Sequence, residues 1–175
     1  MILSGKQIRE KLGTEILIDP FTESQLNPNS YNLTLHNELL VYTNPVLDMK
    51  KENNTEHIII GTEGFILEPQ RLYLARTTEY IRTDYYVPML EGRSSIARLG
   101  LLVHVSAGLG NIGSAGYWTL ELVATQPIRI YAGIQICQIY FQQLFGSYDI
   151  YSSKYKDSTD IQPSYLYKEL DKKKA

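Results

Sequence analysis

The sequence is poor in the residues that build disulfide frameworks and zinc sites. Its 175 residues include one cysteine and three histidines. One cysteine cannot form a disulfide within the chain, and Cys137 stands in the apolar run 134–141, so we expect a small buried side chain there. The tripeptide His36-Asn37-Glu38 matches the H-x-E of zinc nucleobase deaminases, but the P-C-x-x-C that completes their metal site is missing. We therefore expect any hydrolytic chemistry to proceed without zinc.

A strong charge imbalance and long apolar runs are missing as well. The net charge is −2 at pH 7, so nothing indicates general nucleic-acid binding. No apolar run reaches the roughly 20 residues of a membrane-spanning helix, and the stretch MILSGKQIREKLG has no signal-peptide core. We expect a cytoplasmic protein without nucleic-acid or membrane partners.

What the sequence does contain is a series of short β-type runs separated by turn residues. Many such runs at close spacing indicate an antiparallel sandwich or barrel. The expected strands cover residues 15–18, 31–35, 39–42, 57–60, 64–67, 72–77, 101–105, 117–123, 128–131 and 134–141. The fold class is therefore mainly β, with a core that a chain of this length can bury.

Two short helices interrupt this pattern. The stretch Ser4-Gly5-Lys6-Gln7 matches a capping box and predicts a short N-terminal helix. The stretch RSSIARLG, residues 93–100, predicts one internal helix, with Ser94 or Ser95 as its cap and Gly100 at its end. We expect a barrel domain over residues 1–146 and a polar, Tyr-rich tail over residues 147–175.

The glycine stretch GLGNIG, residues 108–113, has the spacing of a dinucleotide-binding loop. That loop needs a helix directly after the glycines and an acidic residue about 20 positions further on. Here the aromatic and β-branched run YWTLELV follows, which is typical of a strand. We expect a glycine-rich, hairpin-like loop between two strands.

Two segments carry polar groups suited to chemistry. In EGRSSIARLGL, residues 91–101, arginines and hydroxyls surround a helix N-terminus and could hold a polyphosphate; the alternative is a surface helix with solvated arginines. In GYWTLELVA, residues 116–124, alternation places Tyr117, Thr119 and Glu121 on one face and Trp118, Leu120 and Leu122 on the other. Glu121 could serve as a general acid or base; the alternative is a solvent-facing glutamate or one paired with Arg98.

Taken together, these segments resemble the dCTP deaminase family within the trimeric dUTPase superfamily. The stretches GRSSIARLGLLVHVSAG, TLEL and GIQICQIYF stand in the family's order, NPNSYNLTL resembles its N-terminal motif, and SKYKDSTDIQPS resembles its closing tail. The resemblance implies a distorted antiparallel β-barrel or jelly roll and a homotrimer with shared active sites. It also implies dCTP as substrate, Mg²⁺ bound through the substrate triphosphate, and dTTP as an inhibitor.

The resemblance also assigns roles to residues. Glu121 matches the catalytic proton carrier, Ser94 and the backbone near Ala107 match groups that position the attacking water, and Arg98 matches the arginine that orients the glutamate. The tail, including residues 147–175, would close over the nucleotide, with Tyr148 or Tyr151 taking part. The matched substrate-binding positions are Arg93, Ser94, Ser95, Ile96, Ala97, Arg98, His104, Val105, Asn111, Thr119, Leu120, Gln138, Tyr148, Lys154, Tyr155 and Gln162.

The chain departs from the family pattern in the glycine loop, where Asn111 replaces an expected aspartate. An asparagine keeps an acceptor for the deoxyribose but has no basicity, so hydrolysis of dUTP should suffer most. In the tail, Ser158 stands where glutamine is common, and Gln162 is a nearby replacement. We therefore expect deamination of dCTP to dUTP and ammonia. The alternatives are a bifunctional enzyme that gives dUMP and pyrophosphate, and a non-catalytic nucleotide-binding regulator.

Overall fold

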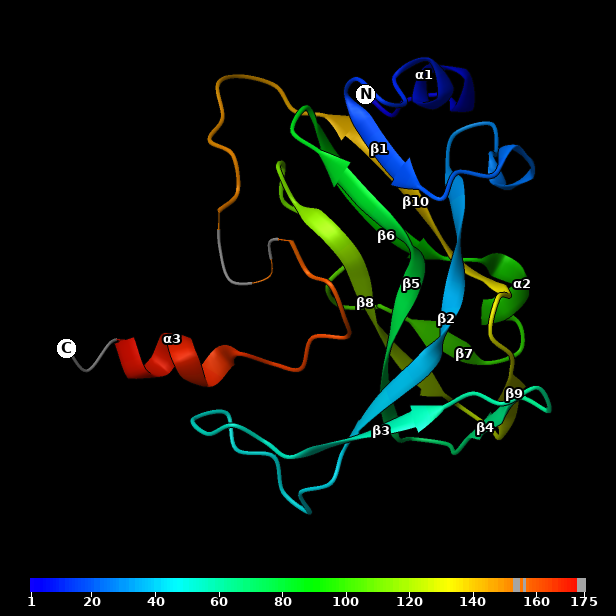
Figure 1. Ribbon diagram of the computed structural model, residues 1–175, viewed down its shortest axis with the longest axis vertical. Helices are drawn as coiled ribbons and strands as arrows, with labels where there is room; N and C mark the ends of the chain where they lie inside the picture. Colours follow the sequence, from blue (N-terminus) through cyan, green and yellow to red (C-terminus); the bar gives the residue numbers. More distant parts are fainter. Residues whose placement is uncertain (153–154, 156, 173–175) are drawn as a thin grey trace.

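A strongly twisted antiparallel sheet that curls into a nearly closed barrel makes up most of the molecule (Figure 1). The computed structural model describes residues 1–152, 155 and 157–172. The main sheet has the strand order β6-β10-β2-β5-β8-β7, with β1 paired to β5 and β3 paired to β2, and β4 and β9 form a small second sheet. The strands are β1 (Ile16–Asp19), β2 (Tyr31–Tyr42), β3 (Thr55–Ile59), β4 (Phe65–Leu67), β5 (Leu72–Thr83), β6 (Tyr86–Gly92), β7 (Leu101–Val103), β8 (Ala115–Ala124), β9 (Ile128–Ile130) and β10 (Gln135–Gln143).

The predicted mainly β class is confirmed, but several strands differ from expectation, and β5 runs to Thr83 where the expected strand ended at residue 77. The runs 31–35 and 39–42 form one long strand, β2, whose register against β5 shifts between Leu35 and Leu39. Strand β6 was not predicted, because Pro88 interrupts its pattern. It lies at the end of the strand order, where a missing backbone N–H is tolerated. The glycine loop covers this edge, since the Gly110 N–H donates to the Pro88 carbonyl at 2.8 Å.

The helices are short and peripheral. They are α1 (Gly5–Glu10), the 3-10 turn η1 (Glu23–Gln25), α2 (Ser94–Ala97) and α3 (Leu166–Lys172). The predicted capping box of α1 is present, with Ser4 and Gln7 bonded reciprocally. The predicted cap of α2 is wrong, because Arg93 is the N-cap and its side chain makes no cap hydrogen bond. The sequence did not predict α3 within the tail.

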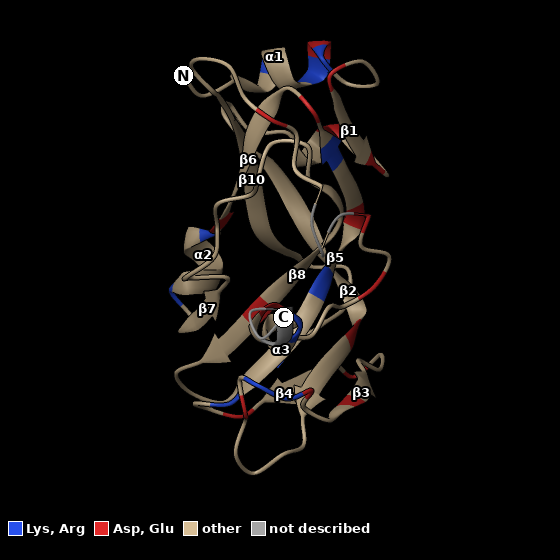
Figure 2. Cartoon of the chain, turned by 90° about the vertical axis from the view of Figure 1, so that its left-hand side faces the viewer, with Lys and Arg blue, Asp and Glu red and all other residues tan. Residues whose placement is uncertain are grey.

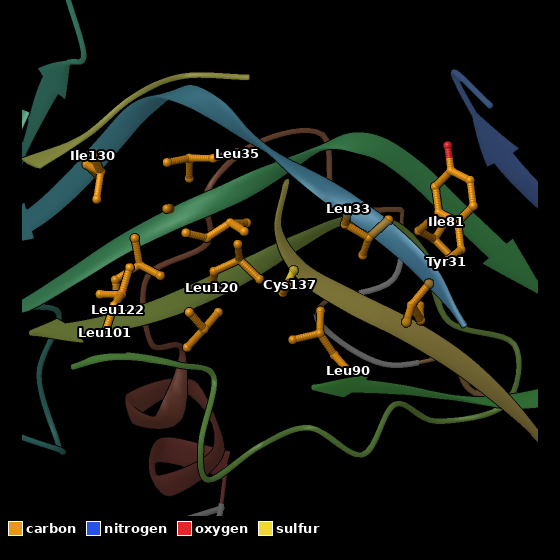
Figure 3. Close-up of a cluster of buried hydrophobic side chains, with 14 of the residues drawn as sticks. Tyr31, Leu33, Leu35, Ile81, Leu90, Leu101, Leu120, Leu122, Ile130 and Cys137 are labelled. Atoms are coloured by element: carbon orange, nitrogen blue, oxygen red, sulfur yellow. The ribbon is translucent and has the colours of Figure 1, made fainter. Parts of the chain in front are cut away.

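The core lies inside the barrel, where side chains from β2, β6, β8 and β10 meet (Figure 3). Leu33 and Leu35 from β2, together with Leu120 from β8, are fully buried. Cys137 is fully buried as predicted, and this burial raises the pKa of its thiol. The sulfur therefore packs as a small apolar group.

The outer surface mixes both signs of charge. On the side seen in Figure 2, acidic and basic residues are interspersed over the strands and helices. Within the described ranges, no helix has the length and apolar character needed to cross a membrane.

Candidate active site

A cavity of about 480 Å³ lies between β8, the glycine loop and the tail, and we call it the β8 cavity. Its strand wall includes Thr119 and Glu121, its loop wall includes Ala107 and Asn111, and the tail closes the remaining side. The predicted alternation explains this placement, since Leu120 and Leu122 are fully buried while the Glu121 side chain is 36% exposed. The Leu120 side chain therefore faces the core, and Leu120 does not line the β8 cavity.

Glu121 pairs with a histidine at the entrance of the glycine loop. Nδ1 of His104 is in direct contact with Oε2 of Glu121, and the His104 side chain is only 7% exposed. Nε2 of the same ring lies 2.8 Å from the carbonyl oxygen of Ala107. The ring packs edge-to-face on Trp118, with centroids 5.9 Å apart. His104 has a backbone φ of 53°, so it turns the chain sharply where β7 ends.

These contacts assign the tautomer of the His104 ring. A carbonyl oxygen can only accept, so Nε2 of His104 carries a hydrogen and donates it to Ala107. In the neutral form of this tautomer Nδ1 carries no hydrogen and faces the carboxylate of Glu121. The cavity wall thus brings together an imidazole and a carboxylate, two side-chain types that commonly serve in general acid–base chemistry.

Arg98 does not take part in this arrangement. It forms the C-cap of α2, is exposed, and lines neither of the two cavities described here. The alternative in which Arg98 pairs with Glu121 is wrong for the single chain, because the carboxylate of Glu121 contacts His104 instead.

The residues around α2 border a second cavity, of about 560 Å³, which we call the α2 cavity. Arg93 donates from Nη1 to the Gln135 carbonyl at 2.7 Å. The Gln138 amide accepts from Ser30 at 2.8 Å and donates to the Gly92 carbonyl at 3.1 Å, so both ends of this amide are engaged within the chain. The predicted positions that line this cavity are Arg93, Ser94, Ala97, His104, Val105 and Gln138.

The single chain therefore divides the predicted site into two parts. The two cavities share only His104 and Leu109 among their lining residues. Ser94 borders the α2 cavity, whereas Glu121 borders the β8 cavity. Ser95 and Ile96 belong to α2 but line neither cavity.

The glycine loop joins β7 to β8, which pair as antiparallel neighbours, so the predicted hairpin is confirmed. Two of its glycines make room for the tail. Gly116 has a φ of 136°, and a Cβ there would lie 2.7 Å from the Ser158 nitrogen. Gly113 has a φ of 83°, and a Cβ there would overlap Ile150. The glycines at these positions permit close packing of the tail on the barrel.

Two of the four predicted tail residues line the β8 cavity. Tyr155 and Gln162 do so, and the Tyr155 ring stacks on Tyr165 with centroids 5.6 Å apart. Tyr148 lies elsewhere, with its hydroxyl 3.5 Å from the Asp84 carbonyl, and the alternative Tyr151 lines the cavity in its place. Lys154 lies outside the described residues.

Several wall residues were missed by the sequence reasoning. Trp118 was placed on the core face, yet it also borders the β8 cavity, near a register shift of β8 against β5 between Arg76 and Tyr80. Tyr42 and Leu72 come from the ends of other strands, and no local pattern identifies them. Their position depends on sheet register alone.

Comparison with known proteins shows which molecules this chain resembles over its whole length. It is 62% identical over 171 residues to "dCTP deaminase, dUMP-forming" of Clostridium acetobutylicum, covering 97% of this chain and 99% of the relative. It is 57% identical over 173 residues to the protein of the same name from Cytophaga hutchinsonii, covering 98% and 100%.

A solved structure supports the same fold. The 2'-deoxycytidine 5'-triphosphate deaminase from Agrobacterium tumefaciens matches with a TM-score of 0.65 at 19% identity, over 81% of this chain. The match spans 48% of that protein's length, so this chain corresponds to about half of it. At this identity the likeness concerns the fold.

The relatives overturn one expectation from the sequence. Asn111 favoured an enzyme that releases dUTP, but the relatives at 57% to 62% identity are named dUMP-forming. The prediction of dUTP as end product is therefore wrong. The lack of a carboxylate at position 111 therefore does not identify dUTP as the end product.

The family assignment rests on most of the chain. The family model described as dCTP deaminase-like matches residues 2–144, which include both cavity walls of the barrel, α2 and Glu121. The chain belongs to the dCTP deaminase-like family.

Proposed function

We propose that this protein converts dCTP to dUMP, with release of ammonia and pyrophosphate. One water replaces the amino group at C4 of cytosine, and a second cleaves the triphosphate between the α and β phosphates. The observation that carries this proposal is the full-length similarity to dUMP-forming dCTP deaminases. The direct contact of Glu121 with His104 in the wall of the β8 cavity supports it.

In this proposal Glu121 performs the proton transfers of deamination. The carboxylate takes a proton from the attacking water, passes it to N3 of the cytosine, and later helps ammonia to leave. Ser94 and the backbone near Ala107 position the water, and Asn111 contacts the deoxyribose. Ala107 lines the β8 cavity and its carbonyl lies 2.8 Å from Nε2 of His104, which supports a role for this stretch of backbone.

We further propose that the active unit is a homotrimer whose sites lie between chains. Glu121 and Ser94 border different cavities in one chain, so a second copy has to supply the missing half. Large apolar side chains lie exposed beside the α2 cavity, with Val105 at 73%, Leu109 at 66% and Leu102 at 42% exposure. Such a patch is typical of a surface that another chain covers.

The Mg²⁺ of this proposal arrives with the substrate. Among the described residues each cavity has one glutamate in its wall, Glu121 in one and Glu91 in the other. Mg²⁺ is commonly held by substrate phosphates and few carboxylates, and it neutralises phosphate charge there. Zinc independence, a cytoplasmic location and inhibition by dTTP stay predictions.

The proposal is tested by identifying the products. Purified protein with Mg²⁺ and dCTP should release ammonia, dUMP and pyrophosphate in equal amounts, measured by ion-exchange chromatography and an ammonia assay. Accumulation of dUTP without dUMP would contradict the second hydrolysis. Tight binding of dCTP without any product would contradict both steps.

A further inference from the structure

The segment 157–164, which we call the docking strap, forms the tail wall of the β8 cavity. It runs along β8: the Asp157 N–H donates to the Ala115 carbonyl at 2.8 Å, and the Tyr117 N–H donates to the Ser158 carbonyl at 3.0 Å. Further on, the Gln162 N–H donates to the Thr119 hydroxyl at 2.9 Å. The strap residues Ser158, Gln162, Pro163 and Ser164 line the cavity.

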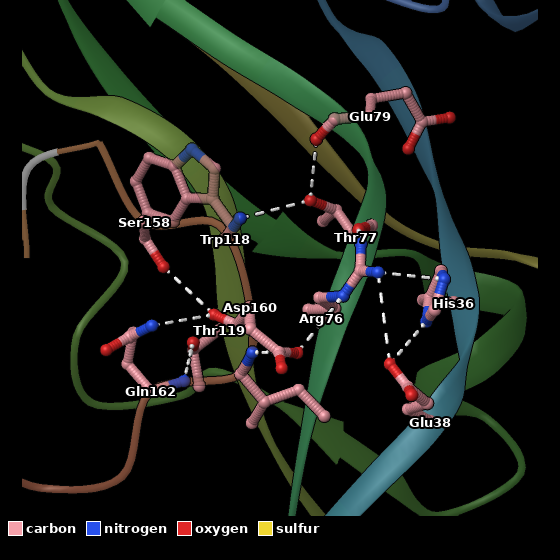
Figure 4. Close-up of polar contacts among 11 residues, drawn as sticks. His36, Glu38, Arg76, Thr77, Glu79, Trp118, Thr119, Ser158, Asp160 and Gln162 are labelled. Carbon is pink, nitrogen blue, oxygen red and sulfur yellow. Dashed lines mark hydrogen bonds and ion pairs between the residues drawn. The ribbon is translucent and has the colours of Figure 1, made fainter. Parts of the chain in front are cut away.

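A polar cluster on the barrel lies behind the strap, and Arg76 of β5 is its centre (Figure 4). Its Nη2 lies 2.9 Å from Nε2 of His36 and 3.9 Å from Oε2 of Glu38, both on β2. Its Nε lies 3.6 Å from Oδ1 of Asp160 in the strap. The guanidinium also lies over the Tyr117 ring, 4.5 Å from the centroid. Neither Arg76 nor Asp160 lines the cavity.

Because Arg76 is largely buried, its guanidinium needs a nearby negative charge, and Asp160 of the strap supplies one. The Arg76 side chain is only 13% exposed, and a guanidinium removed from water needs nearby anions. Among the described residues its Nε has no hydrogen-bond acceptor within range, and Asp160 is the carboxylate nearest to it. Docking of the strap therefore brings a negative charge to a buried cation that the barrel alone leaves incompletely paired.

Asp160 contacts Arg76 and also makes hydrogen bonds that hold the conformation of the strap. Its Oδ1 accepts from the Ile161 N–H at 2.7 Å, and its carbonyl accepts from the Ser158 hydroxyl at 2.9 Å and from the Gln162 amide at 3.1 Å. Ile161 is 5% exposed and packs into a small buried cluster on β2 and β5. One side of the strap is thus fixed to the barrel, while Ser158 and Gln162 face the cavity.

We propose that Arg76 is a positioning residue: by pairing with Asp160 it docks the strap on its own barrel and sets how tightly the tail closes over the nucleotide. Arg76 acts through the strap, since it does not border the cavity itself. The kinetic half of this inference rests on the proposed function, whereas the docking half does not.

The test uses Asp160→Asn in the full chain, because this partly exposed side chain can lose its charge without opening the core. Asp84→Asn is the matched control, since Asp84 pairs with Arg82 at 3.0 Å in the hairpin between β5 and β6. Amide hydrogen exchange of Tyr117 and Gln162, whose N–H groups join strap and barrel, is followed without nucleotide. Steady-state kinetics with dCTP gives KM and kcat.

We expect Asp160→Asn to speed exchange of both amides by about threefold to tenfold, the range for one partly exposed ion pair. KM should rise by a similar factor while kcat stays within about twofold, and Asp84→Asn should change neither readout. Arg76→Gln should speed exchange at least as much, since it also removes the contacts to His36 and Glu38. Adding Asp160→Asn to Arg76→Gln should have little further effect, because the contact between the two side chains is already lost.

Unchanged amide exchange in Asp160→Asn would overturn the proposal. Faster exchange with an unchanged KM would overturn the link between docking and closure. Equal effects in Asp84→Asn would overturn the specific role of the pair. If the unmodified protein does not turn over dCTP, the proposed function fails, and the exchange data still decide whether Arg76 docks the strap.

Discussion

At the scale of single residues, the Glu121–His104 pair is the feature with the clearest chemical consequence. The two side chains are in direct contact, and the other ring nitrogen of His104 lies 2.8 Å from the carbonyl oxygen of Ala107. A glutamine at position 121 keeps the size of the side chain and removes its ability to take or give a proton.

We expect Glu121→Gln to lower the rate of deamination by about 10²–10⁴-fold, the usual contribution of a general acid or base. The affinity for dCTP should change less than about threefold, since the triphosphate contacts are retained. Rates of ammonia release and binding by calorimetry check this, with the exposed Glu56→Gln as control. Deamination at near-normal rate in Glu121→Gln would contradict the assigned role.

Asn111 shows the limit of reading one residue. It lies exposed in the wall of the β8 cavity, where an amide can still bond to a sugar hydroxyl. The missing charge at Asn111 favoured dUTP as the predicted end product, and that prediction is wrong. One position does not show which group supplies the base for the second hydrolysis.

At the scale of elements, the packing of the tail on β8 depends on glycines rather than on side chains. A Cβ at Gly116 would lie 2.7 Å and 2.8 Å from the backbone nitrogen and oxygen of Ser158. Backbone atoms cannot move aside as a flexible side chain can, so the strap has to shift.

Gly116→Ala is therefore expected to release the strap and to destabilise the barrel only moderately, by roughly 1–2 kcal/mol for a left-handed backbone position. Limited proteolysis of the tail should become faster, and Tm should fall by a few degrees. Gly61→Ala is the control, because nothing lies within 4 Å of a Cβ there. Equal proteolysis of the two variants would contradict this account.

The packing of the strap on β2 and β5 should depend on pH through the protonation of His36. Arg76 donates to its Nε2, so the ring is neutral; Arg76 of β5, Glu38 of β2 and Asp160 of the strap face it. Burial and then Arg76 hold the pKa of His36 below its ordinary value of 6.5. The stabilisation is therefore present above pH 6.5 and is lost as the pH falls below that value.

We expect tail proteolysis to increase as the pH is lowered from 7 through the region below 6.5, and the exchange rate of the Gln162 amide, divided by the intrinsic amide rate at each pH, to increase with it. His36→Gln keeps an acceptor for Arg76 and does not titrate, so it should remove this pH dependence. A pH dependence that persists in His36→Gln would assign the effect to another group.

At the scale of the whole molecule, Glu121 and Ser94 border different cavities of one chain, which is why we propose that each site is built from two chains. This predicts complementation between inactive variants. Glu121→Gln and Ser94→Ala should each be inactive alone, yet a refolded mixture should regain roughly a quarter of the normal activity. Random assembly gives each site one intact side from either chain in that proportion. No regain of activity, with mixed trimers verified by mass spectrometry, would contradict a shared site.

Much of the fold was accessible from the sequence because its signals are local. Alternation in YWTLELV placed Glu121 opposite Leu120 and Leu122, and the capping box located α1. The run YWTLELV also excluded a dinucleotide-binding loop, because its composition predicts a strand where that loop needs a helix. Each of these inferences depends on residues within one strand or one helical turn.

Other features could be decided only by the tertiary structure. Within one chain Glu121 contacts His104, Arg76 meets Asp160 of the tail, and Ser94 faces a different cavity from Glu121. These contacts join segments far apart in the chain, and their geometry follows from strand register and bulges such as the shift between β5 and β8. The sequence by itself determined the local elements and the family; the assembled sheet decided which side chains meet, because register is a property of paired strands.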